Sequence, residues 1–212
     1  MRTMLFSCVL AAILASGASA EMITFDQDAA GRTPEGWIAG VTGSGSARWM
    51  VATDDSAPSK PNVLRQSAVG AFPWIVLERY KALDGFVETR FRPLAGREDQ
   101  AGGIVWRFQS GDSYYVARAN ALEDNVSIYY VERGSRKTIR YVDARSFGGN
   151  VARNQWHTLR VEYRGPKHSV FLDGRKALEV EDGHITAPGT VGLWTKADSV
   201  TSFDDFAYGP NP

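Results

Sequence analysis

Two arginines, a tyrosine and an asparagine form the most distinctive group of polar side chains in this sequence. They are Arg107, Tyr114, Arg118 and Asn120, and they fall within AGGIVWRFQSGDSYYVARAN, residues 101–120. The planar fork of a guanidinium and the amide of an asparagine suit vicinal hydroxyls or a carboxylate. An aromatic ring can stack on the flat face of a sugar. These residue types predict a site for a polar ligand, provided that one surface carries all four.

Strands are the elements that would position these side chains. Successive residues of a strand point to opposite faces, and 101–134 alternates in character. The set expected to face a core is Ile104, Trp106, Phe108, Tyr115, Ala117 and Ala119. The set expected to face solvent is Val105, Arg107, Gln109, Tyr114, Val116, Arg118 and Asn120. A turn through Ser110–Ser113 keeps both sets in register, so Arg107 and Arg118 are predicted to share one face of a hairpin.

A second segment is predicted to extend this polar surface. In 190–196 the apolar residues alternate toward the core and leave Trp194 and Lys196 on the opposite side. The sequence leaves two alternatives open. Instead of binding a ligand, the arginines could pair with acids such as Glu88 on a solvated sheet surface. Trp194, instead of facing a ligand, could pack beneath a loop. The complete predicted ligand-binding set is Arg107, Tyr114, Arg118, Asn120, Trp194 and Lys196.

The rest of the chain also reads as strands separated by turns, with no sustained helical period after residue 20. Besides the three strands in 101–134, strands are predicted at 22–26, 48–53, 63–66, 74–78, 86–92, 138–143, 156–164, 169–172, 177–181, 190–196 and 201–208. The glycine-rich stretch 31–46 is predicted to be mostly loop. Asp173-Gly174 predicts a type I′ turn between two strands. About a dozen strands suffice for two packed sheets, so the predicted fold class is an all-β sandwich.

The first 20 residues have the features of an export signal. Arg2 precedes the apolar run Leu5–Ala15, and Ala18-Ser19-Ala20 matches the small-residue pattern before a cleavage site. The apolar run is far shorter than the ~20 residues that span a bilayer, so no membrane insertion is expected for the mature chain. The sequence therefore predicts one domain over 21–212, exported to the periplasm or the medium.

Composition argues against several classes of partner and chemistry. The chain has 24 Lys and Arg against 24 Asp and Glu, so it lacks the basic excess that nucleic-acid binding favours. Cys8, inside the predicted signal, is its only cysteine. The three histidines are not spaced as metal ligands, and neither a cofactor nor a metal is predicted. The alternative is a structural calcium held by Asp26, Asp204 and Asp205 near the chain ends.

The order of several motifs resembles a known group of proteins. GRTPEGW is followed by GGIVWRF, GDSYYVARANALEDN, WHTLRVEY, VFLDGR, GTVGLWTKADS and FDDFAYG. This order, over residues 23–209, resembles the concanavalin A-like lectin/glucanase superfamily. Within it, the chain is most similar to the 3-keto-disaccharide hydrolase domain family, and more narrowly to exported bacterial single-domain proteins. The resemblance implies a two-sheet jelly roll whose concave sheet carries a glycan site.

Three functions are consistent with these features. The leading hypothesis is an exported module that binds carbohydrate and needs no cofactor. The second is a hydrolase acting on glycosides, in which Glu123, Asp124 or Glu88 supplies an acid or base. The Glu-x-Asp-x-x-Glu run of laminarinase-like enzymes is missing from the sequence, which argues against a conventional glucanase. The third is a structural envelope protein whose groove is filled by its own loops, such as 95–100.

Overall fold

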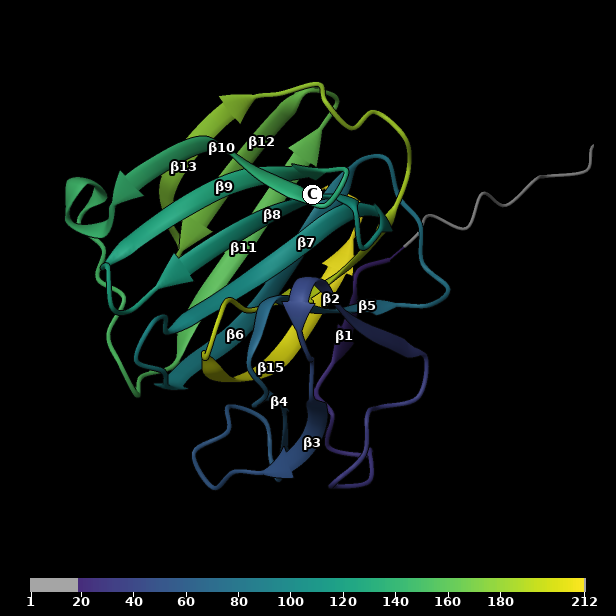
Figure 1. The fold of residues 1–212 in the computed structure, drawn as a ribbon, viewed down its shortest axis with the longest axis vertical. Helices are drawn as coiled ribbons and strands as arrows, with labels where there is room; N and C mark the ends of the chain where they lie inside the picture. Colours follow the sequence, from purple (N-terminus) through teal and green to yellow (C-terminus); the bar gives the residue numbers. More distant parts are fainter. Residues whose placement is uncertain (1–18, 212) are drawn as a thin grey trace, which may run out of the picture.

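The computed structural model describes residues 19–211 and is built almost entirely of strands (Figure 1). One turn of 3₁₀-helix, η1 (Ala144–Phe147), is the only helical element in that range. The strands are β1 (Glu21–Ile23), β2 (Trp37–Gly45), β3 (Trp49–Thr53), β4 (Asn62–Gln66), β5 (Gly70–Leu77), β6 (Gly85–Ala95), β7 (Ala101–Ser110), β8 (Ser113–Asn120), β9 (Asn125–Glu132), β10 (Ser135–Asp143), β11 (His157–Arg164), β12 (Lys167–Leu172), β13 (Arg175–Glu181), β14 (Thr190–Trp194) and β15 (Val200–Gly209).

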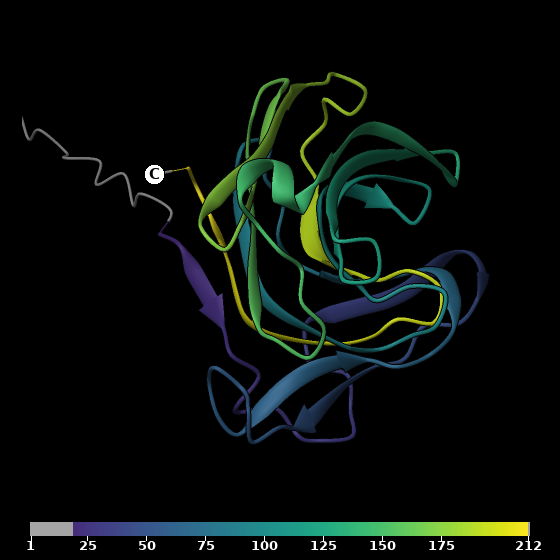
Figure 2. The ribbon, with the colours of Figure 1, turned by 90° about the vertical axis from the view of Figure 1, so that its left-hand side faces the viewer.

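These strands form two antiparallel sheets that pack face to face. Sheet A has the order β13-β12-β11-β6-β15-β4-β3, with β1 paired to β15. Sheet B has the order β10-β9-β8-β7-β14-β5-β2. Figure 2 shows the sandwich from the side, with β11–β13 of sheet A in one layer and the curled strands of sheet B in the other. The predicted all-β two-sheet sandwich is therefore confirmed.

Aromatic side chains fill the space between the sheets. The ring of Trp106 in sheet B stacks on Tyr115 and contacts Tyr163 and His168 of sheet A. The Trp106 indole Nε1 donates to His168 Nδ1 at 3.3 Å, so this buried N–H has an acceptor. Five of the six residues predicted to face the core do so, namely Ile104, Trp106, Tyr115, Ala117 and Ala119.

Strand β2 corrects the prediction that 31–46 is mostly loop. Its glycines are needed for side-chain packing rather than for flexibility. Gly40 pairs with Trp74 of β5, and a Cβ atom at Gly40 would lie 2.4 Å from the indole ring. Only a residue without a side chain allows the Trp74 ring to lie across the strand. The prediction of a loop was based on the glycine content, but in β2 the glycines make room for neighbouring side chains.

The turn between β12 and β13 has the predicted geometry. Leu172 pairs with Arg175, which leaves Asp173 and Gly174 as the two turn residues. Their φ angles are 49° and 76°, and two positive values are required by a type I′ turn. Asp173 also accepts a hydrogen bond from the backbone N–H of Thr158 at 2.7 Å, which ties the turn to the start of β11.

The acids near the chain ends bind separate partners. Strand β1 pairs with β15, but Asp26 accepts from the backbone N–H of Asn62, whereas Asp205 forms an ion pair with Arg90 at 3.3 Å. Residues 19–211 contain no group of three or more side chains arranged to hold a metal ion. Over the same range, no helix is long and apolar enough to cross a bilayer. The predicted signal lies largely in 1–18, outside the described residues, and stays a prediction.

Asp204 of β15 is a buried carboxyl in sheet A. It accepts hydrogen bonds from the backbone and hydroxyl of Ser59, at 2.9 and 2.7 Å, and from the backbone of Asp205 at 2.7 Å. Burial outweighs these bonds and raises the pKa of Asp204 to about 6. Because a raised pKa favours the protonated form in the folded state, the stabilisation is full below about pH 4 and lost as the pH rises through 6.

Asp204→Asn should remove this pH dependence. Between pH 4.5 and 7.5 the wild-type protein should lose about 1 to 3 kcal/mol of unfolding free energy relative to the variant, which cannot ionise at this position. Urea unfolding at both pH values measures this difference. Stability curves that run parallel for the two proteins would contradict the buried, protonated carboxyl.

Candidate functional site

The outer face of sheet B carries a row of residues that crosses all seven strands. The row follows from the pairing register, because each member is the Cα partner of the next. From β2 to β10 it reads Gly40, Trp74, Trp194, Gly103, Arg118, Ser127 and Tyr141. Members of one row point to the same face of a sheet. The predicted residues Trp194 and Arg118 thus lie on one face, separated only by a glycine.

Two adjacent tryptophans in the first half of this row are flanked by glycines for a steric reason. A Cβ atom at Gly103 would lie 3.1 Å from the ring of Trp194, just as one at Gly40 would overlap Trp74. Trp194 lies flat against the sheet and is fully buried, with Phe72 of β5 stacked on it at 5.7 Å between ring centroids. Phe72 therefore covers Trp194, and the Trp194 ring packs under the surface of this face without being accessible to a ligand.

Arg118, 3% exposed, is the centre of a polar network at one end of the face. Its Nη2 donates to Glu123 Oε2 at 2.6 Å and to Asn125 Oδ1 at 2.9 Å. The Asn125 amide donates in turn to Glu123 at 2.6 Å. Arg118 Nη1 also lies 3.8 Å from Asp99 Oδ2. The guanidinium is thus held between two carboxylates, which fixes its orientation.

Asp99 extends the network toward β14. The carboxylate accepts from Asn120 Nδ2 at 2.6 Å and pairs with the Lys196 ammonium. The Asn120 carbonyl oxygen accepts from the backbone of Leu122 at 2.9 Å, so both ends of this amide are satisfied. Asp99 and Asn120 are fully buried, whereas the Lys196 side chain is partly exposed. Of the predicted residues, Arg118, Asn120 and Lys196 are therefore brought together in one network.

The two carboxyls of the network have pKa values displaced in opposite directions. Burial raises the pKa of Asp99, against the opposing effects of Lys196 and Arg118. Burial also acts to raise the pKa of Glu123, but the hydrogen bond from Asn125 and the charge of Arg118 outweigh it and lower that pKa. Glu123 is consequently ionised at neutral pH and, with 45% of its side chain exposed, available to a ligand.

Tyr141 is the exposed aromatic ring of this face. It is 53% exposed and lies on the edge strand β10. Its hydroxyl accepts a hydrogen bond from Asn125 at 3.0 Å, which connects the ring to the polar network. The sequence analysis missed this residue. Alternation along 138–143 groups Tyr141 with the inward Ile139, but a register shift between Thr138 and Arg140 places Tyr141 in the outer row, so no sequence signal marks it.

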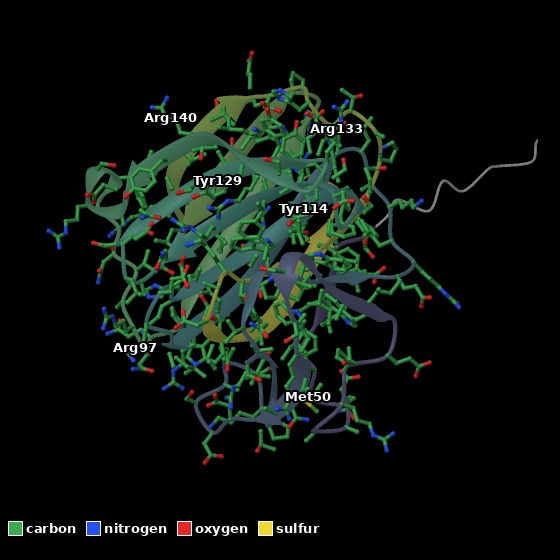
Figure 3. The ribbon with its side chains drawn as sticks, in the orientation of Figure 1. Met50, Arg97, Tyr114, Tyr129, Arg133 and Arg140 are labelled. Carbon is green, nitrogen blue, oxygen red and sulfur yellow. The ribbon has the colours of Figure 1, made fainter. Side chains whose placement is uncertain are left out.

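The middle of the same face is a second, smaller apolar cluster. Tyr114 and Tyr129 lie within it and are labelled in Figure 3, next to the β9–β10 hairpin that carries Arg133 and Arg140. The Tyr114 hydroxyl lies 3.0 Å from Thr42 Oγ1 and is fully buried. The cluster comprises Val76, Val105, Phe108, Tyr114, Val116, Tyr129, Val131 and Trp194. Tyr114 therefore packs within the face instead of presenting its ring to a ligand.

Arg136 of β10 covers this cluster. Its guanidinium lies 4.3 Å from the ring centroid of Tyr129, 4.7 Å from that of Phe72 and 5.8 Å from that of Trp194. Five strand steps separate β10 from the strand of Phe72, so a flat sheet would hold them roughly 24 Å apart. Sheet B must therefore curl strongly. The middle of its hollow is filled by side chains, and the loop 95–100 contributes Asp99 at the edge.

A hollow of about 360 Å³ remains open beside this filled region. It lies where the ends of β2, β5 and β14 meet the loop before β7. Phe72 supplies an aromatic wall, and Lys196 and Glu98 supply charges of opposite sign. The full lining is Ser44, Gly45, Val69, Gly70, Ala71, Phe72, Glu98, Lys196 and Ala197. A ring-shaped polar ligand would find both a flat apolar surface and hydrogen-bonding groups here.

Arg107 does not lie on this face, contrary to the prediction. Strand β7 takes four residues from Trp106 to Ser110, while β8 takes two from Tyr115 to Ser113. This bulge gives Arg107 a positive φ of 45° and turns its side chain toward the end of the sandwich. The regular alternation that placed Arg107 beside Arg118 ends at Trp106.

The Arg107 guanidinium instead joins three loops. It donates to the carbonyl oxygens of Leu83, Ile185 and Gly165 at 2.8, 2.8 and 2.7 Å. Asp84 lies 3.4 Å away, and the residue is 1% exposed. Every nitrogen of the fork has a protein partner. Arg107 is therefore a structural residue that holds these loops together.

The same bulge moves Phe108 to the outer face of sheet B. The prediction placed Phe108 with Trp106 in the main core, but its ring stacks on Tyr114 at 5.2 Å and contacts Trp74 at 4.7 Å. Gly189 is needed beside the bulge, because a Cβ there would lie 2.4 Å from the backbone of Arg107. One irregular turn of the backbone accounts for both misplacements.

The other acids considered from the sequence lie elsewhere. Glu88 pairs with Arg160 at 3.4 Å on sheet A and does not meet the arginines of sheet B. Asp124 accepts from the backbone of Val151 at 2.8 Å and contacts Arg145, so it anchors the loop after η1. Only Glu123 of the three reaches the candidate face.

Comparison with known proteins adds evidence at the level of the fold. No protein-family model and no curated relative matches the sequence. The carbohydrate-binding module CBM66 from Bacillus subtilis superposes with a TM-score of 0.64 at 20% identity, covering 81% of this chain and 93% of that one. A β-glucanase from Bacillus licheniformis gives 0.59 at 13% identity, covering 93% and 100%. The fold is a concanavalin A-like jelly roll.

A third solved structure shares this fold. The exoplasmic/lumenal domain of VIP36, in a form bound to Ca²⁺ and Man3GlcNAc, gives a TM-score of 0.56 at 11% identity over 82% of this chain and 83% of that domain. At identities this low, the structural similarity establishes the jelly-roll architecture alone. The chemistry of this chain must be argued from its own residues.

Arg107→Met should destabilise the protein without weakening ligand binding. It leaves the buried carbonyl oxygen of Ile185 and the part-buried ones of Leu83 and Gly165 without their donor, so the unfolding free energy should fall by about 2 to 4 kcal/mol in urea titration. Arg140→Met, at an exposed position of β10, is the matched control and should change stability little. An Arg107→Met protein that is as stable as wild type but has lost its ligand would contradict the structural role.

Proposed function

We propose that this protein is an exported carbohydrate-binding module that holds a saccharide on the outer face of sheet B. The observation that carries the proposal is the row across sheet B, which connects Trp74 and Trp194 through Arg118 to the exposed Tyr141. Two neighbours in fold, CBM66 and VIP36, are by name a carbohydrate-binding module and a mannose-glycan complex. Export rests on the signal-like residues 1–20.

The accessible groups are those a sugar requires. The Tyr141 ring offers a flat surface to one face of a pyranose, and Glu123 beside it accepts hydrogen bonds from hydroxyls. Lys196 donates from the other side, at the edge of the open hollow. These groups come from β10, from the loop after β8 and from the loop after β14. A saccharide of several residues could therefore extend across the sheet.

The buried groups keep this surface rigid. Arg118 orients Glu123, and Asp99 holds Lys196, so a ligand would meet side chains that are already ordered. A preordered site avoids the entropic cost of immobilising side chains on binding. In this assignment Arg118, Asn120 and Trp194 position the binding groups from beneath, and Lys196 contacts the sugar directly.

Tyr141→Ala and Lys196→Ala should each weaken saccharide binding at least tenfold, about 1.4 kcal/mol, because both remove a group that contacts the ligand. Isothermal titration against plant, algal and bacterial oligosaccharides measures the effect. Lys176→Ala, on the exposed surface of sheet A, is the control and should bind like wild type. Failure of the wild-type protein to bind any saccharide of the panel would overturn the proposal.

A second candidate function is glycoside hydrolysis of the 3-keto-disaccharide hydrolase type. The specific observation in its favour is that Asp99 and Glu123 flank one guanidinium and have pKa values displaced in opposite directions. Such a divergence often separates an acid from a base. Against it, both carboxylates are occupied by cations and Asp99 is fully buried.

Glu123→Gln distinguishes the two functions. A binding module should release no product from keto-sugar or ordinary disaccharides, with or without the substitution, in a chromatographic assay of sugar release. A hydrolase should release product as wild type and lose at least a hundredfold of that rate in the variant, while retaining binding. Turnover by the wild-type protein that depends on Glu123 would replace the module by the enzyme.

A further inference from the structure

Arg136 is a cation without a counter-ion. Among residues 19–211 its guanidinium has no carboxylate within 4.0 Å and no hydrogen-bond acceptor; its Nη1 is buried and unpartnered. It is held only by the faces of Tyr129, Phe72 and Trp194. A guanidinium keeps its charge even when partly buried, and a desolvated charge without a partner is costly.

The neighbouring cations do not share this condition. Arg118 is paired with Glu123 and lies near Asp99, and Lys196 is paired with Asp99. The two cations and two carboxylates of the polar network therefore balance one another. Among the described residues Arg136 has no carboxylate within ion-pair distance, although Glu98 lines the adjacent hollow and Asp99 acts on it from farther away.

The unsatisfied hydrogen-bonding groups of this face are of one kind. Four of the buried polar atoms that lack a partner in residues 19–211 belong to its side chains, and all four are N–H donors. They are Trp74 Nε1, Arg118 Nε, Arg136 Nη1 and Trp194 Nε1. The Trp194 N–H faces the Tyr114 hydroxyl and partly offsets the rise that burial causes in the pKa of that tyrosine, so the inference rests on the first three donors. Arg118 and Arg136 also approach the same Tyr129 ring, at 5.8 and 4.3 Å. A face with unpartnered donors and a guanidinium that lacks an ion pair fits a ligand that supplies anionic acceptors.

The strand that carries Arg136 adds to this field. Arg133, Lys137 and Arg140 are exposed along the β9–β10 hairpin, between Glu132 and Asp143. Lys137 and Arg140 pair with Tyr130 and Ile128, on the face opposite to Arg136, so they act on a ligand only through their long-range charge. Charges of one sign beside a site attract an oppositely charged ligand before contact is made.

We propose that the saccharide bound by sheet B is acidic, and that Arg136 recognises its carboxylate, as in a uronate unit. This inference rests on the proposed sugar-binding function and names its ligand class. The Arg136 side chain, held by ring contacts alone, turns from the aromatic floor to form a bidentate pair with the carboxylate. The sugar ring then takes the place of the guanidinium beside Phe72, at the wall of the open hollow.

The test compares acidic polymers with their neutral methyl esters. Polygalacturonate and alginate oligosaccharides, and the esterified form of each, are titrated into wild-type protein at constant ionic strength. We expect at least tenfold tighter binding of the acids than of the esters. Arg136→Gln should remove this difference, whereas Arg140→Gln, which removes the same charge from an exposed position of β10, should retain it. Arg136→Lys, which keeps the charge without the planar fork, should give an intermediate preference.

The outcomes separate the two proposals. If acid and ester bind equally, or if Arg136→Gln and Arg140→Gln behave alike, the carboxylate assignment is overturned while sugar binding stands. Binding of neutral saccharides alone has the same consequence. If no saccharide of either kind binds to the wild-type protein, the proposed function fails as well. Thermal unfolding of each variant confirms that a lost preference does not reflect a lost fold.

Discussion

The pairing register of sheet B determines where each candidate binding group lies. Gly40 and Gly103 leave space for the rings of Trp74 and Trp194, so the two indoles lie flat along one row of the sheet. A register shift of one residue in β5 or β14 would move the Trp74 or Trp194 ring to the opposite face of the sheet. The same shift in β7 would replace Gly103 as the residue paired with Arg118. A side chain at Gly40 or Gly103 would overlap or crowd these rings, so the aromatic surface of the curved sheet depends on both glycines.

Curvature gives this face two different regions. In the middle, the sheet curls until Arg136 of one edge reaches Phe72 near the other, and a small apolar cluster closes beneath them. Toward one end, a balanced set of two cations and two carboxylates replaces the apolar residues. The first region contributes area and an unpaired charge, and the second contributes oriented polar groups. A ligand that spans both meets stacking surfaces and hydrogen bonds together, a combination suited to saccharides.

The individual site residues show where reasoning from alternation succeeds and where it ends. Arg118, Asn120 and Trp194 lie on one face because β8 and the end of β14 are regular, and Lys196, in the loop after β14, is held near them by Asp99. Arg107 and Phe108 were assigned by the same rule and misplaced, because two additional residues in β7 form a bulge that no composition signal announced. The sequence also did not predict that most of the proposed site residues are buried. Residues chosen for their chemistry mostly support the surface, while Tyr141, Glu123 and Phe72 form it.

The sequence by itself determined the all-β sandwich, the inward side of the central hairpin, the Asp-Gly turn and the sheet face that carries Arg118 and Trp194. These features depend on local periodicity and on turn chemistry, which act between neighbours along the chain. The tertiary structure alone decided the bulge at Arg107, the strand hidden in the glycine-rich segment and the meeting of Arg136 with Phe72. Each of these depends on contacts between residues far apart in sequence, where the curl of a whole sheet sets the distance.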